Sequence, residues 1–392
     1  MQRTRLVELF VAFFCIGLTS FGMAILQNLK AMTLRRRFLS EQALREGLAL
    51  VQLYPGPIMV DLVAFIGYRN HGVLGALVAT IGFLLPATVL MLLASAAYLS
   101  YGNLPAIAIM LSGLNALVVG VVLNVTLDFA QKNLNSRIEA ILALLAFILG
   151  ILHVDPLWAV LGGLLLGALV WRSTDESEPV VPPETFEWSK LAIPGLVCLG
   201  LVIIAAWAAY HPSPLGDLVA AFMKIGAVAF GNGATILPVM QQAVVGEHHW
   251  LTSSQFGTAI GLGQITPGPI LNSATFVGYL VAGPGGALAA TFAIFAPSFA
   301  MTLVFTELFV HVRHLGAIQG AIRGVMAVFV GLLAGITLGL GQQALTQPMA
   351  FVFAAAALVA LRYLKWDMLV VLAGGLLAWG GWYYLEATIG KL

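Results

Sequence analysis

The stretch QLYPGPI, which runs from Gln52 to Ile58, recurs as QITPGPI from Gln264 to Ile270. A Pro-Gly-Pro triplet interrupts a helix, because proline lacks an N–H and clashes with the preceding turn, while glycine tolerates sharp turns. Yet both triplets lie in a chain of 392 residues that is 60% hydrophobic and only 9% charged. Soluble domains carry about 25% charged residues. The composition, with a mean hydropathy of +0.98, therefore predicts a membrane protein whose helices are broken at two related points.

The composition also argues against several classes of function. The formal net charge is +1, which predicts no nucleic-acid partner. The sequence contains no nucleotide-binding motif, which argues against direct coupling to ATP. A membrane-embedded enzyme would need a cluster of catalytic groups within the spans, whereas all seven histidines fall in or beside predicted loops. The sequence therefore predicts neither an enzyme nor a cofactor or metal site.

The two triplets belong to a longer internal repeat. FFCIGLTSFG (13–22) matches FMKIGAVAFG (222–231), and FIGY (65–68) matches FVGY (276–279), after which the register is constant at 276 − 65 = 211. So many ordered matches predict a tandem repeat of one membrane domain. The expected organisation is a first repeat over 1–171, a polar cytoplasmic linker over 172–190, a connecting transmembrane helix over 191–210 and a second repeat over 211–392.

The positions of Lys and Arg predict that the two repeats have opposite orientations. Basic residues collect on the cytoplasmic side of membrane proteins. In the first repeat they occupy the loops around 30–45, 69, 132–137 and 172, and the loops at 99–105 and 152–155 have none. In the second repeat the distribution is reversed, with Arg313, Arg362 and Lys365 in the counterparts of the empty loops. The single helix over 191–210 would supply the inversion.

The same charges predict what the triplets do. Arg35–Arg37 and Arg69 place both flanks of the segment 43–69 on the cytoplasmic side, so the segment enters the membrane and returns. Each arm of about 12 residues is roughly 18 Å long at 1.5 Å per residue, which reaches the middle of the bilayer. The triplets then form the tips of re-entrant hairpins. Two such tips near the midplane would aim helix N-termini at one central space, which favours an anion.

The predicted fold class is an all-α polytopic membrane protein with two inverted-topology repeats. Each repeat has re-entrant or broken hairpins with Pro-Gly-Pro tips and about four spanning helices. Two alternatives remain open for the segments ending in Phe-Gly (6–27 and its counterpart). They form a second pair of hairpins, or they span the membrane outright, since about 20 apolar residues suffice for a span.

The motifs SFG, RRRFLSEQAL, LALVQLYPGP and FIGYRNHGVLGA, with their counterparts KIGAVAFGNG, GQITPGPILNSATFVGY and GGALAA, resemble the long, two-domain form of the chromate ion transporter family. The resemblance covers nearly the whole chain. It implies export of chromate from bacterial cells, with sulfate as a competitor of the same shape. The positions that the family motifs carry over are Gly22, Gln52, Pro55, Gly56, Pro57, Tyr68, Arg69, Lys224, Gly231, Gly233, Gln264, Pro267, Gly268, Pro269, Asn272 and Tyr279.

The residues themselves favour a binding site at the tips. Gln52 and Gln264 each lie one helical turn before a triplet, so their amides would sit beside the backbone amides of the tip. The alternative is that glutamines and prolines only brace the hairpins. Thr266 and Asn272 add donors to the second tip, and Asn232 lies between the two glycines of the second Phe-Gly segment.

Three charged residues are further candidates. Lys224 lies in an apolar run, where a charge is expensive and either binds substrate or snorkels to the interface. Asp61 follows Pro57 by four residues and either carries a proton with the anion or pairs with Arg69. Arg69 is predicted to lie where the anion enters or to anchor the helix.

The predicted function is a secondary transporter that exports chromate, or a related tetrahedral oxyanion, by alternating access across the bacterial cytoplasmic membrane. The N-terminus is expected in the cytoplasm. The alternatives are a transporter or exchanger for sulfate or another oxyanion, and a channel-like anion pathway. The expected partners are the anion and the lipid bilayer, and a homodimer is a hypothesis based only on the habits of membrane transporters.

Overall fold

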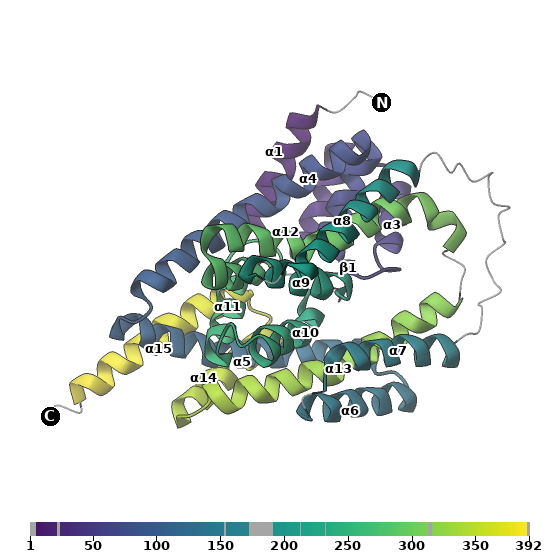
Figure 1. Ribbon diagram of the computed structural model, residues 1–392. Helices are drawn as coiled ribbons and strands as arrows, with labels where there is room; N and C mark the ends of the chain where they lie inside the picture. Colours follow the sequence, from purple (N-terminus) through teal and green to yellow (C-terminus); the bar gives the residue numbers. More distant parts are fainter. Residues whose placement is uncertain are drawn as a thin grey trace.

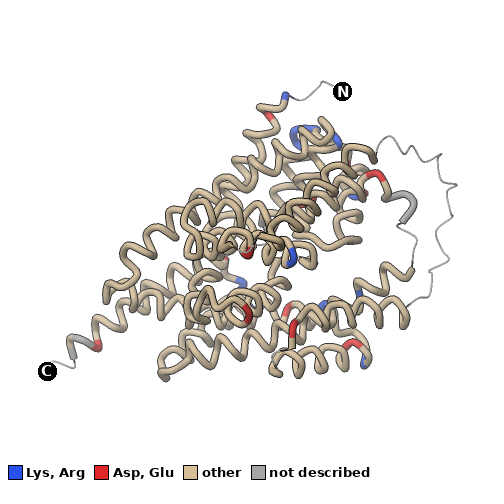
Figure 2. The backbone as a smooth tube through the Cα atoms, in the orientation of Figure 1, with Lys and Arg blue, Asp and Glu red and all other residues tan. Residues whose placement is uncertain are grey.

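The computed structural model describes residues 5–21, 24–152, 154–171, 191–211, 213–231, 233–312 and 316–389. The predicted linker over 172–190 and the candidates Gly22 and Asn232 lie outside these residues. The described chain is a bundle of helices of very different lengths (Figure 1). Long stretches of its backbone carry no charged residue (Figure 2), as expected for helices that face lipid or one another.

The first repeat contains seven helices and one short strand in its described part. They are α1 Leu6–Thr19, α2 Ala24–Arg35, α3 Glu41–Leu50, β1 Gly56–Pro57, α4 Ile58–Tyr101, α5 Pro105–Asn133, α6 Arg137–Ile151 and α7 Pro156–Val170. The connecting helix α8, Ala192–Tyr210, follows.

The second repeat has the same order of long helices, but its strand follows its first helix, and short 3-10 and π segments lie in its broken helices. Its elements are α9 Pro214–Ala227, β2 Phe230–Gly231, η2 Ala234–Ile236, α10 Leu237–Gln241, η3 Gln242–Glu247, α11 Ser253–Ile265, η4 Ile270–Asn272, α12 Ser273–Val312, α13 Gly316–Ala344, α14 Pro348–Arg362 and α15 Met368–Ile389.

Six helices in the described residues are long and apolar enough to cross a membrane, which makes the chain a polytopic membrane protein. They include α4, α5, α8 and α13, with parts of α12 and α15. Helices form at all four spans expected in the first repeat, but α6 and α7 have only 15 residues each. At 1.5 Å per residue that is about 22 Å, shorter than the roughly 30 Å hydrocarbon core.

The backbone repeats with the register found in the sequence. The long helix α4 is kinked at His71 and Gly72, where φ is −142° and 60°. The long helix α12 is kinked 211 residues later, at Ala282 and Gly283, where φ is −143° and 63°. Each kink separates the returning arm of a hairpin from the span that follows it.

The Phe-Gly segments are broken helices. In the first repeat α1 ends at Thr19 and α2 begins at Ala24, and in the second repeat α9 ends at Ala227 before the short strand β2. Neither α1 nor α9, at 14 residues, is long enough to cross the membrane alone. Each segment is therefore a broken helix, as a hairpin requires, and its return to the same side of the membrane stays a prediction.

The repeats exchange contacts at their broken segments. The first tip pairs with the second Phe-Gly segment as two parallel strands, Gly56 opposite Phe230 and Pro57 opposite Gly231. At the second tip the Gly268 N–H donates to the carbonyl of Ser20 in the first Phe-Gly segment, at 3.2 Å. Each tip is therefore held by the other repeat.

Helices of the two repeats also pack against each other in the core. Helix α5 of the first repeat packs against α14 and α15 of the second, while α13 packs against α6 and α7. The hydroxyls of Thr126 and Thr337, equivalent residues 211 apart, lie 3.1 Å from each other. An equivalent pair in mutual contact marks a two-fold relation between the repeats, as two inverted copies require.

Candidate functional site

The second tip, Thr266–Pro269, borders an open cavity of about 150 Å³ that we call the second-tip pocket. Its volume lies below the 300–1,000 Å³ typical of sites for organic ligands, and it suits a small inorganic ion. The pocket is lined by Ile25, Met59, Asn124, Val125, Asp128, Phe129, Lys132, Ala234, Gly263, Gln264, Thr266, Gly268, Pro269, Ile270 and Met368. Both repeats therefore contribute to it.

The polar wall of the pocket from the first repeat comes from one face of α5. Asn124, Asp128 and Lys132 are spaced by four residues, which places them above one another on a helix. Asp128 is paired with Arg362 of α14 at 3.3 Å, so its charge is balanced. Lys132 has no ion-pair partner in the described part of the chain and leaves a positive charge at the pocket.

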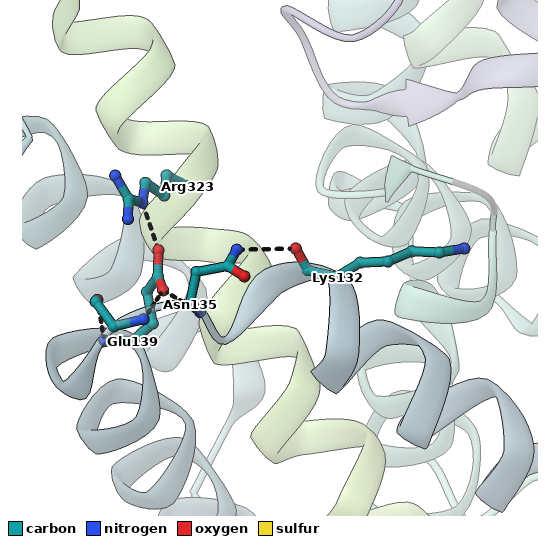
Figure 3. Close-up of polar contacts among 5 residues, drawn as sticks. Lys132, Asn135, Glu139 and Arg323 are labelled. Atoms are coloured by element: carbon teal, nitrogen blue, oxygen red, sulfur yellow. Dashed lines mark hydrogen bonds and ion pairs between the residues drawn. The ribbon is translucent and has the colours of Figure 1, made fainter.

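The surroundings of Lys132 explain why its ammonium remains free. The buried carboxylate of Glu139 on α6 accepts from Arg323 of α13 and from the backbone N–H groups of Asn135 and Ser136, at 2.6 Å each. Figure 3 shows the side chain of Lys132 extending away from this cluster. Glu139 therefore ties α6 to α13 and does not neutralise Lys132.

The other wall comes from the second hairpin. The Gln264 side chain lines the pocket and makes no hydrogen bond within the described residues. The Oδ1 end of the Asn124 amide is buried without a partner there. Thr266 donates to the carbonyl of Leu262 at 3.0 Å. The Asn124 Oδ1 is an acceptor and does not bind an anion, so the donors that the pocket offers to a small anion are the amide N–H groups of Gln264 and the ammonium of Lys132.

The backbone of the second tip offers less than the sequence suggested. Proline has no N–H, and the Gly268 N–H is used by Ser20. Pro267, Gly268 and Pro269 are buried, and Gly268 and Pro269 line the pocket. The first-turn N–H groups of the returning arm, which starts at Ile270 on the pocket wall, are the backbone donors at a helix start.

The first tip has a different environment. Pro55, Gly56 and Pro57 are held against β2, and Gln52 is exposed at the end of α3. A Cβ on Gly56 would collide with the Asp61 carboxylate, and would lie 3.0 Å from the Cβ of Ser298. Asp61 and Ser298 thus pack directly against the first tip.

The charged candidates lie apart from one another. Asp61 is fully buried, whereas Arg69 is exposed, and neither carboxylate oxygen of Asp61 has a hydrogen-bond partner among the described residues. The structure therefore does not pair these two residues. Lys224 forms an ion pair with Asp155 at 3.2 Å in a separate cavity of about 260 Å³. That cavity also contains Asp217 and Glu247.

The remaining candidates support the tips. Gly231 and Gly233 have φ of 82° and 87°, a conformation that favours glycine, and they form the bend that receives the first tip. Asn272 is fully buried beneath the second tip, and both ends of its amide lack a partner in the described chain. Sequence reasoning missed Asn124 and Lys132. With Asp128 between them, these residues recur every four positions in an apolar helix, which was a readable signal.

Comparisons with known proteins agree with the two-repeat organisation. The chain matches the chromate transporter family twice, over residues 7–168 and 216–379. It is 28% identical to the chromate transport protein of Cupriavidus metallidurans, over 87% of this chain and 84% of that protein. It is 29% identical to the chromate transport protein of Pseudomonas aeruginosa, over 95% of this chain and 91% of the relative. An uncharacterized transporter of Methanocaldococcus jannaschii is 29% identical over 85% and 83%. No solved structure matches the chain.

Proposed function

Because the chain belongs to the chromate transporter family, we propose that it transports chromate, or an oxyanion of the same shape, with the second-tip pocket as its binding site. The observation that carries the proposal is the convergence of the Lys132 ammonium and the Gln264 amide on a small open cavity at the second tip. One cation with neutral donors neutralises a tetrahedral dianion only in part, which leaves the anion able to dissociate. Membership in a transporter family argues against the membrane-embedded enzyme.

We further propose that transport is export from the cytoplasm by alternating access. Lys132 lies in the last turn of α5, at an end that the distribution of basic residues places on the cytoplasmic side, so the pocket would open toward the cell interior. An inside-negative membrane potential favours exit of an anion by about 2.3 kcal/mol per charge per 100 mV. The expected setting is a bacterial cytoplasmic membrane with the N-terminus inside, and a homodimer stays a hypothesis.

The experiment is uptake of labelled chromate into inside-out vesicles, with Gln264→Ala and the matched variant Gln52→Ala. A lost hydrogen bond to a charged group costs about 1.5–3 kcal/mol, so Gln264→Ala is expected to lower uptake about tenfold or more. Gln52→Ala removes the equivalent glutamine, which is exposed outside the pocket, and is expected to stay within about twofold. Equal losses would mean that both tips bind the anion, and no loss in either variant would contradict a site at the second tip.

The alternatives give different results in the same vesicles. A sulfate transporter or exchanger would prefer labelled sulfate and would show counterflow when unlabelled anion is trapped inside. A channel-like pathway would conduct without saturation and without counterflow. A saturable chromate uptake that unlabelled sulfate inhibits supports the proposed carrier.

A further inference from the structure

The side chain of Asp61 is a buried acid that the second-tip pocket does not use. It belongs to the returning arm after the first tip, at the start of α4, and it is fully buried. Neither of its oxygens has a hydrogen-bond partner among the described residues. An ionised carboxylate in such a place costs several kcal/mol unless a counter-charge or a proton accompanies it.

Among the residues that the structure describes, the groups around Asp61 supply no counter-charge. The hairpin presents the phenol of Tyr54, which is the ionisable group that faces the carboxyl. Helix α12 presents the hydroxyls of Ser298 and Thr302. Ser298 donates to the carbonyl of Phe295 at 3.2 Å, and the Thr302 hydroxyl lies 2.8 Å from the Tyr54 hydroxyl. Strand β2, packed against the tip, consists of Phe230 and Gly231 and adds no charge.

The second repeat has a neutral version of the same arrangement. There Asn272, also fully buried, lies beneath the tip, with its Nδ2 3.9 Å from the Cβ position of Gly268. Ala87 of α4 takes the place of Ser298, because a Cβ on Gly268 would lie 2.9 Å from its Cβ. The fold therefore tolerates a neutral, unpartnered amide at this position. Packing alone does not require an acid at position 61, so the carboxyl of Asp61 points to a chemical role.

The returning arm that carries Asp61 also reaches the anion site. Met59, two residues earlier in the same returning arm, lines the second-tip pocket. In the protein interior two negative charges repel each other more strongly than in water. A bound dianion therefore favours the protonated form of Asp61, and protonation of Asp61 favours the anion by the same factor.

We propose that Asp61 is a proton-binding site coupled to the anion in the second-tip pocket. The proposal rests on the proposed function. The proton comes from the water on the side to which the pocket is open, bonds to a carboxylate oxygen of Asp61, and leaves when the anion leaves. No electron transfer and no co-reactant are involved, so the step is balanced as carboxylate plus proton giving the acid.

The test uses purified protein in liposomes that contain a pH-sensitive dye. Chromate is added at an alkaline pH, where the free anion is the dianion and carries no proton of its own, and uptake is driven by an imposed potassium diffusion potential. With the unaltered protein, protons are expected to move in the direction of chromate and only when chromate is present. With Asp61→Asn, proton movement is expected to fall to background while chromate uptake stays within about threefold.

Two further variants separate the outcomes. Asp217→Asn removes an acid from the separate cavity that contains Lys224 and is expected to retain proton movement. Asp61→Ser is smaller and cannot titrate, so it replaces Asp61→Asn should the latter fail to accumulate. Chromate uptake without proton movement in the unaltered protein, or continued proton movement in both Asp61 variants, overturns the proton site and leaves the proposed function intact. Absence of any chromate uptake by the unaltered protein overturns both.

Discussion

At the first tip, the space beside Gly56 is filled by the Asp61 carboxyl and by Ser298. At the second tip, the Cβ position of Gly268 faces Ala87, and Gly268 also lines an open pocket with Gln264 and Lys132 on its walls. The two tips share the Pro-Gly-Pro sequence, the arrangement of hairpin and returning arm, and the helix of the other repeat that covers the glycine. They differ in the side chains around this common backbone.

The comparison teaches that the duplicated feature is the break in the helix and not the binding chemistry. Prolines and glycines, which determine the backbone, are repeated in both copies. In the repeat register of 211, Asp61 corresponds to Asn272. On α5, Lys132 corresponds to Gln343, Asp128 to Gly339 and Asn124 to Gly335. On our two proposals, the symmetric frame binds an anion at one tip and a proton at the other.

The largest effect is expected for Gly268→Ala, which tests whether the second tip has to fit as closely as the first. Gly268 has a φ of 106°, which an L-residue adopts at a cost of roughly 1–2 kcal/mol, and its Cβ would also collide with Ala87 at 2.9 Å. Loss of most chromate uptake is expected, with a lower midpoint of thermal unfolding for a fluorescent fusion in detergent.

The matched control is Gly283→Ala. This residue also has a positive φ, 63°, but its Cβ would meet nothing within 4 Å. It is expected to lose stability from the backbone alone and to keep measurable uptake. Equal loss in the two variants would mean that backbone strain, and not the fit of the second tip against Ala87, governs the result.

The next effect concerns the charge at the second-tip pocket. Lys132→Gln gives the first repeat the residue that the second repeat has at position 343. Because the lysine is exposed, its attraction for the anion is reduced by solvent, and an increase in KM of about threefold to tenfold is expected. The increase should shrink as salt is raised, since ions screen exposed charges.

Arg45→Gln is the control for general surface charge. Arg45 is exposed on α3, where it pairs with Glu41 at 2.7 Å, and it does not line the pocket. Its KM is expected to stay within about 1.5-fold. If both variants raise KM equally, the anion responds to the total charge of the cytoplasmic face and not to Lys132.

A smaller effect of opposite sign is expected for Asp128→Asn. This change removes a negative charge from the wall of the pocket, so KM should fall about twofold to threefold, in proportion to the weak interactions of half-exposed charges. Arg362→Gln leaves Asp128 without its partner and should raise KM instead. Shifts of the same sign in the two variants would contradict an anion in this pocket.

The sequence alone predicted much of the fold, because the same local sequence pattern occurs in both repeats and each copy supports the interpretation of the other. The register of 211 locates both kinks, at His71–Gly72 and at Ala282–Gly283. The two Pro-Gly-Pro breaks lie where the hairpin tips form. The sequence could not choose between broken and spanning Phe-Gly segments, because length and hydropathy allow both. The choice depends on non-local contacts such as Gly268 with Ser20.

The site was predicted less completely, for a physical reason. A symmetric pattern predicts symmetric chemistry, whereas burial decides which glutamine reaches a cavity, and Gln264 does while Gln52 is exposed. Lys224 has apolar neighbours in the sequence, but in the structure it forms an ion pair with Asp155 of the other repeat. No spacing along the chain encodes that contact. The polar face of α5, by contrast, could be read from the spacing of Asn124, Asp128 and Lys132.

The smallest effect is expected for Ser298→Ala, and it addresses the comparison most directly. The Ser298 hydroxyl donates to the carbonyl of Phe295 in its own helix, and the second repeat has Ala87 at the equivalent place. Removing the hydroxyl therefore leaves no buried polar group unsatisfied, because the Phe295 carbonyl keeps its helical partner. Chromate uptake at constant pH should stay within about twofold in inside-out vesicles. A tenfold loss would mean that the anion touches the first tip, and the division of labour between the two tips would then have to be abandoned.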